Sequence, residues 1–195
     1  MEERTIISRK FGTRKIAVVG MLSAITIALG LSGYGFIPLP FAKATIMHLP
    51  VIIGAIIEGP VVGISIGLIF GIFSIMQNIT APTVLSFAFI NPLVSVLPRM
   101  LIAVTAYYCY KFAFGKNETL KIGIGAAVGS LTNTFGVLTM IYFLYAERFA
   151  QARGISPSLA AKTIYTIALT NGIPEAVIAV IVTVPVVLAI RRLGK

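Results

Sequence analysis

The chain has 195 residues, a mean hydropathy of +0.98 and only 11% charged residues, whereas a soluble domain carries about a quarter. This composition excludes a water-soluble monomer and makes membrane lipid the expected solvent. The formal net charge of +10 would suggest a nucleic-acid partner for a soluble protein. Here the basic residues gather at the chain ends and in loops, which indicates membrane topology and no nucleic-acid partner.

The first half of the chain predicts three membrane spans within a single membrane domain, residues 1–195. A spanning helix needs about 20 mostly apolar residues, and the first candidate covers 16–31. The charged segment before it has no small-residue cleavage site, so we expect a retained span rather than a signal peptide. After a Gly/Pro-rich loop, GYGFIPLPFAK, a long apolar run is interrupted by EGP. We divide that run into two short spans, 46–57 and 60–76.

The second half predicts three further spans, 92–114, 122–145 and 168–190, separated by the polar stretches GKNETLK and AERFAQARGISPSLAAKT. Six spans place both termini on one side. That side would carry most of the basic residues, namely Arg4, Arg9, Lys10, Arg14, Lys15, Lys111, Lys116, Lys121, Arg191, Arg192 and Lys195. The other side would carry only Lys43, Arg148, Arg153 and Lys162. By the positive-inside rule we expect an all-α integral membrane protein, a six-transmembrane-helix bundle with both termini cytoplasmic.

Two ionisable residues, Arg99 and Glu175, fall well inside predicted spans. Each follows a proline, Pro98 or Pro174, so we expect both helices to be interrupted there. At ~1.5 Å per residue, both would lie ~12 Å from the outer end of their span. A charge within the membrane costs at least ~2.5 kcal/mol and usually marks a pathway or a binding site.

These residues have a functional and a structural interpretation. In the first, Arg99 binds an anionic group in an outward-facing pocket, and Glu175 accepts hydrogen bonds from hydroxyl or amine groups. In the second, the two charges only neutralise each other, and the nearby polar side chains only hold helices together. His48 is expected to cap or line the outer loop. The other candidate substrate-binding residues are Lys43, Asn78, Asn91, Asn133 and Asn171, with Thr132 as a further hydrogen-bonding group.

Small residues recur at every fourth position on two spans. On the third span, Gly59, Gly63, Gly67 and Gly71 predict close helix packing inside the bundle. On the first span, Gly20, Ala24 and Ala28 predict either the same kind of packing or the docking of an external partner.

Signatures of catalysis are absent from the sequence. It has no Walker phosphate loop, no paired histidine ligands and no nucleophile elbow, and it contains one histidine and one cysteine. We therefore expect no enzymatic activity, no metal and no cofactor.

Three segments resemble a known family. ATIMHLPVIIGAIIEGPVVGISIGLIFGIFS resembles the second and third spans of the substrate-binding S components of energy-coupling factor (ECF) vitamin transporters. AITIA at 24–28 matches the AxxxA-type motif of their first span, and NPLVSVLPRMLIAV looks like their fourth. The resemblance covers essentially the whole chain, in length, number of spans and position of the termini.

This resemblance implies a high-affinity binding subunit in the bacterial plasma membrane that captures a vitamin near the outer face. The loop 33–45 would cover the pocket, and Ala24 and Ala28 would dock onto a membrane T subunit that carries two ATPases. The chain looks most like the pantothenate-type branch. Arg99 would bind the carboxylate of pantothenate, and Glu175 or the asparagines would bind its hydroxyls.

Other interpretations remain open. The ligand could be riboflavin, folate, a B6 vitamer or cobalamin, and folate also carries carboxylates. Outside this family, the chain could be a structural or assembly membrane protein, or an autonomous channel or small carrier.

Overall fold

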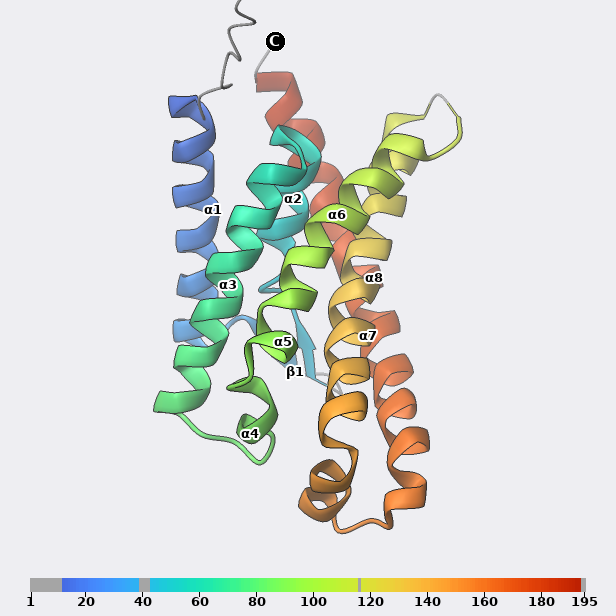
Figure 1. Ribbon diagram of the computed structural model, residues 1–195. Helices are drawn as coiled ribbons and strands as arrows, with labels where there is room; N and C mark the ends of the chain where they lie inside the picture. Colours follow the sequence, from blue (N-terminus) through green and yellow to red (C-terminus); the bar gives the residue numbers. More distant parts are fainter. Residues whose placement is uncertain (1–11, 39–42, 116, 194–195) are drawn as a thin grey trace, which may run out of the picture.

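The computed structural model describes residues 12–38, 43–115 and 117–193. Helices dominate it, and two short antiparallel strands form a hairpin inside the bundle (Figure 1). In chain order the elements are α1 (Thr13–Ser32), β1 (Phe36–Pro38), β2 (Lys43–Thr45), α2 (Leu49–Glu58), α3 (Pro60–Thr80), α4 (Ser86–Phe89), α5 (Pro92–Ser95), α6 (Leu97–Phe112), α7 (Glu118–Arg153), the 3₁₀ turn η1 (Pro157–Leu159) and α8 (Ala160–Leu193).

The start of α1 and the end of α8 lie at the same end of the bundle, which we call the terminal end (Figure 1). The α2–α3 turn and the α6–α7 loop lie there too. The opposite end carries α4 and the α7–α8 connection. Within the described residues, five stretches are long and apolar enough to cross a membrane, whereas α2 is shorter. The prediction of an all-α membrane protein is confirmed.

Of the two helix interruptions expected at prolines, the one at Pro98 is present close by, at Val96, and the one at Pro174 is absent. The helix expected over 92–114 is interrupted, because α5 ends at Ser95 and α6 begins at Leu97, with Pro98 in its first turn. In contrast, α8 begins at Ala160 rather than near residue 168 and runs through Pro174 without a break. The expected interruption at Pro174 is therefore wrong. A proline removes one backbone hydrogen bond from a helix and leaves a carbonyl without its partner. A membrane helix tolerates this loss where neighbouring elements satisfy that carbonyl.

The glycines of α3 allow that helix to lie directly against α6. A Cβ added at Gly67 would lie 2.4 Å from the Arg99 carbonyl oxygen, and one added at Gly71 would lie 2.7 Å from the Cα of Val96. At Gly63 it would lie 2.7 Å from the Cβ of Ala103. The packing interpretation is confirmed for Gly63, Gly67 and Gly71, and their contacts fix the backbone of the segment that carries Arg99. It is wrong for Gly59, which precedes α3 in the turn, where an added Cβ would meet nothing within 4 Å among the described residues.

Two apolar clusters fill the bundle. The large core joins α1, α2, α3, α6, α7 and α8 toward the terminal end and includes Ile52, Ile66, Ile102, Ala126 and Val187. The small core joins α4, α5, α7 and α8 toward the opposite end and includes Val94, Val137, Ile141, Phe149 and Ile164. Along α7, buried polar residues separate the two clusters. We call this zone the polar layer.

Candidate functional site

The polar layer is organised around one face of α7. Ser130, Asn133 and Thr134 are buried and lie on the same side of the helix, since residues three and four apart are neighbours. Ser130 Oγ lies 3.0 Å from Nε2 of His48 at the start of α2. Thr134 donates a hydrogen bond to the carboxylate of Glu175 on α8. This face of α7 thus links α2 and α8 through polar contacts.

Arg99 lies in the first turn of α6 and is only 6% exposed. Its guanidinium donates a 2.7 Å hydrogen bond to the carbonyl of Val94, near the end of α5, where helix carbonyls lack intrahelical partners. The rings of Phe70 and Phe89 lie 5.5 and 5.6 Å from the guanidinium carbon, within cation–π range.

Arg99 keeps an unused donor, because its Nε is buried and has no hydrogen-bond partner. Among the described residues, no carboxylate forms an ion pair with it. A buried charge without a partner is strongly unfavourable. An anionic ligand beside Arg99 would remove that penalty.

Glu175 is 4% exposed, and each of its two carboxylate oxygens accepts a hydrogen bond. One oxygen accepts a 2.9 Å hydrogen bond from the backbone N–H of Thr45 on β2, and the other accepts from the hydroxyl of Thr134. The side chain therefore fastens the β-hairpin to α7 and α8. Because Glu175 does not pair with Arg99, the interpretation in which these two charges neutralise each other is wrong.

His48 lies deeper than the sequence indicated. It is the N-cap residue of α2 but its side chain makes no capping hydrogen bond, and it is fully buried in the polar layer rather than lining the outer loop. Its Nδ1 has no partner. HLP places a proline in the first turn of α2, where proline favours the start of a helix. Because His48 is buried, the helix begins inside the bundle.

Among the asparagines, Asn133 has the clearest spare capacity, because its buried Oδ1 has no partner. Asn78 donates to the Ser74 carbonyl and accepts from the Ser86 hydroxyl, both at 2.8 Å, and so joins α3 to α4. Asn171 is half-buried on α8.

Of the remaining candidates, two form hydrogen bonds within or between helices, and the third has a side chain outside the described part of the structure. Asn91 accepts a 2.9 Å hydrogen bond from the N–H of Leu93 and donates at 3.0 Å to the hydroxyl of Tyr145, where α7 is kinked. Thr132 donates to Thr105 at 2.9 Å across α6 and α7. Lys43 begins β2, and its side chain is outside the described part of the structure.

Several residues of the layer were missed by the sequence analysis. Ser130 and Thr134 stand at helical spacing with Asn133, a signal that could have revealed a polar face within an apolar span. Nothing in the sequence singles out Phe70 and Phe89 among twelve phenylalanines.

The small-residue stripe of α1 points away from the bundle. Gly20, Ala24 and Ala28 are exposed, and a Cβ added at Gly20 would meet nothing within 4 Å among the described residues. The buried residues of α1, Leu22, Ser23, Thr26 and Gly30, lie on the other face. The stripe therefore lies on the outer surface of the bundle, and the packing interpretation does not apply to it.

The fold and the site define a multi-pass helical membrane protein that encloses a charged, incompletely hydrogen-bonded layer between two apolar cores. A family model described as "ECF transporter, substrate-specific component" matches residues 14–187. The chain belongs to this family of cell-membrane transport proteins. It is also 31% identical over 201 residues to the "Pantothenic acid transporter PanT" of Lactococcus lactis subsp. cremoris (strain MG1363), and the match covers 94% of this chain and 97% of that relative.

Proposed function

We propose that this chain is the high-affinity substrate-binding subunit of an ECF importer and that its substrate is pantothenate. The family match and the near full-length likeness to a pantothenic acid transporter support this function. The structural observation that carries the proposal is Arg99, a buried guanidinium with no acidic partner among the described residues.

The polar layer suits the functional groups of pantothenate, which has one carboxylate, two hydroxyls and an amide. Arg99 would bind the carboxylate, because its planar fork of donors matches a carboxylate. The unpartnered Nδ1 of His48 and Oδ1 of Asn133 would bind the hydroxyls or the amide. Glu175 retains lone pairs beyond its two hydrogen bonds and can accept from a hydroxyl.

We further propose six spans with both termini in the cytoplasm. The described basic residues of the terminal end support this orientation, namely Arg14, Lys15, Lys111, Lys121, Arg191 and Arg192. A ten-residue α2 is only about 15 Å long, so it would cross the membrane together with the hairpin that precedes it. The hairpin and the polar layer would then lie toward the outer face.

Binding to the isolated chain tests the substrate. The purified protein, freed of ligand, is titrated calorimetrically with pantothenate, riboflavin, folate, pyridoxine and cobalamin. We expect heat only with pantothenate. Binding of a different vitamin would overturn the pantothenate assignment but keep the binding function. A folded chain that binds none of the five would favour a structural membrane protein.

Transport tests the partners. The exposed stripe of α1 would dock onto a membrane T subunit that carries two ATPases. Ala24→Trp should leave pantothenate affinity unchanged and abolish uptake in cells that contain those partners, while Ile25→Trp, on the same helix beside the stripe, serves as the matched control. Full uptake with Ala24→Trp would show that docking uses another surface, and uptake without any ATPase would favour an autonomous carrier.

A further inference from the structure

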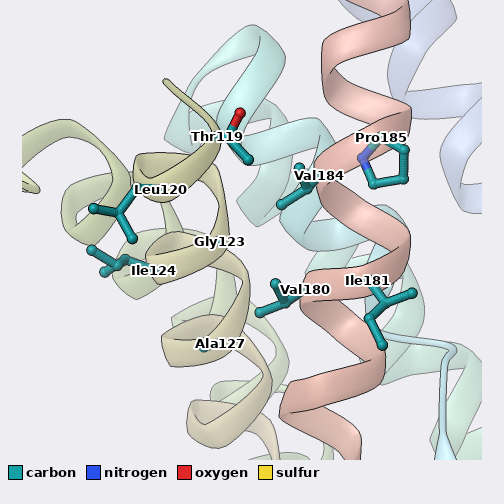
Figure 2. Close-up of a pocket in the computed structure, with 9 residues that line it drawn as sticks. All are labelled: Thr119, Leu120, Gly123, Ile124, Ala127, Val180, Ile181, Val184 and Pro185. Atoms are coloured by element: carbon teal, nitrogen blue, oxygen red, sulfur yellow. The ribbon is translucent and has the colours of Figure 1, made fainter. Parts of the chain in front are cut away.

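An apolar groove of about 510 Å³ follows the seam between α7 and α8, remote from the polar layer and toward the terminal end (Figure 2). Its volume is in the range of ligand-binding sites, about 300–1,000 Å³. The hydroxyl of Thr119 is the polar side-chain group of its lining. The central lining residues are Gly123, Ala127, Val180 and Val184, with Leu120 and Ile181 on the flanks.

Small residues on α7 create the groove. A Cβ added at Gly123 would lie 3.6 Å from Val180 and 3.9 Å from Val184, at ordinary contact distance. Gly123 and Ala127 have the spacing that lets helices approach closely, but α8 already packs against them. These small residues are therefore not free to pack closely against a second transmembrane helix. The flanking Leu120 and Ile181 are 53% and 65% exposed, as expected for a surface in contact with lipid.

Positive charge lies beyond one end of the groove. Helix α8 continues from Pro185 to Arg191 and Arg192, and residue 192 lies on the same side as Pro185, two turns further on. Arg191 is bound to Glu118. Arg192 is exposed and forms no ion pair with any described side chain. An apolar groove that ends below an unpaired arginine matches a molecule with an apolar chain and an anionic head.

We propose that this groove binds one acyl chain of an anionic phospholipid, whose phosphate contacts Arg192. Anionic headgroups of the cytoplasmic leaflet attract basic residues close to the membrane surface, and each contributes about 1 kcal/mol. The site goes beyond vitamin binding, because none of its residues belongs to the polar layer. It would hold a lipid on α7 and α8, the two helices that carry Thr134 and Glu175.

Native mass spectrometry of the purified, delipidated full chain tests the site, with phosphatidylglycerol and phosphatidylcholine of identical acyl chains as probes. We expect the protein to bind phosphatidylglycerol more tightly. Arg192→Gln should weaken phosphatidylglycerol about fivefold, the effect of about 1 kcal/mol, and weaken phosphatidylcholine less, because its choline cation offsets the charge of the same phosphate. Gly123→Leu should fill the groove and weaken both lipids. Lys162→Gln near the other end of α8 is the matched charge control.

Pantothenate binding serves as the folding check for every variant, and Ala127→Leu replaces Gly123→Leu if the latter fails it. Equal affinity for the two lipids in the unmodified protein would overturn the proposal. Unchanged phosphatidylglycerol binding in both Arg192→Gln and the groove-filling variant would also overturn it. A dimer that disappears in the groove-filling variant would assign the groove to a second copy of the chain instead.

Discussion

Two arginines of this protein lie in contrasting surroundings. Arg191, at the terminal end, is part of a local network: it pairs with Glu118, donates to the carbonyl of Ile56 and lies 5.2 Å from the ring of Tyr110. Arg99, in the interior, has aromatic neighbours and one carbonyl but no acidic partner among the described residues. The first charge is thus satisfied by its neighbours at a helix junction, whereas the second keeps an unused donor, Nε, in keeping with the proposed role of Arg99 in binding an anionic ligand.

The largest effect is expected from Arg99→Ala. Truncation of one partner of a buried charge pair costs about 2–5 kcal/mol, so pantothenate affinity should fall by at least about 30-fold. The melting temperature of the ligand-free protein should fall only slightly, because the lost carbonyl hydrogen bond and ring contacts are offset by the removal of a buried charge that has no acidic partner among the described residues. Calorimetry and thermal unfolding in detergent measure the two quantities. Parallel losses of affinity and of ligand-free stability would make Arg99 a structural residue like Arg191.

The packing that positions Arg99 should be sensitive to a single added side chain. Gly67→Val would place a Cβ against the Arg99 carbonyl, at 2.4 Å in the present backbone. We expect a loss of about 1–3 kcal/mol in stability, the usual result of overpacking, together with weaker pantothenate binding. Gly20→Val on the open face of α1 is the control. An unchanged melting temperature for Gly67→Val would contradict the close α3–α6 contact.

An intermediate effect is expected from Glu175→Gln. The amide keeps the shape of the carboxylate but has only one acceptor oxygen, so the hydrogen bond with Thr134 must be lost or reversed in direction if the oxygen accepts from Thr45. In either case both contacts lose the negative charge that strengthens them. Hydrogen bonds to charged groups contribute about 1.5–3 kcal/mol. We expect faster hydrogen exchange at the backbone amide of Thr45 and lower stability. Unaltered exchange at that amide would show that Glu175 does not fasten the hairpin.

The smallest effect is expected from Arg191→Gln. Its ion pair with Glu118 is partly exposed, and such pairs contribute about 0–1 kcal/mol. Pantothenate affinity should stay the same, and the melting temperature should fall slightly. This variant is also the direct counterpart of Arg99→Ala. A large loss of affinity here would remove the contrast between the two arginines.

Patterns within one segment of the sequence predicted the structure well. Apolar runs indicated the helices, EGP marked the α2–α3 turn where Gly59 has a φ of 98°, and the α3 stripe indicated close packing. The prolines misled in one case, because Pro98 and Pro174 look alike in sequence. Pro98 follows a short helix that ends three residues earlier, whereas Pro174 lies in a long helix that packs along α7.

The amino-acid sequence by itself determined that this is a helical membrane protein with charges inside its spans, because hydropathy and charge position depend only on the order of residues. The tertiary structure alone decided which groups meet those charges. Glu175 finds Thr45 and Thr134, and Arg99 finds Phe70, Phe89 and the Val94 carbonyl. Most of these contacts join different helices or the hairpin, so they depend on how the elements pack and no local pattern reveals them.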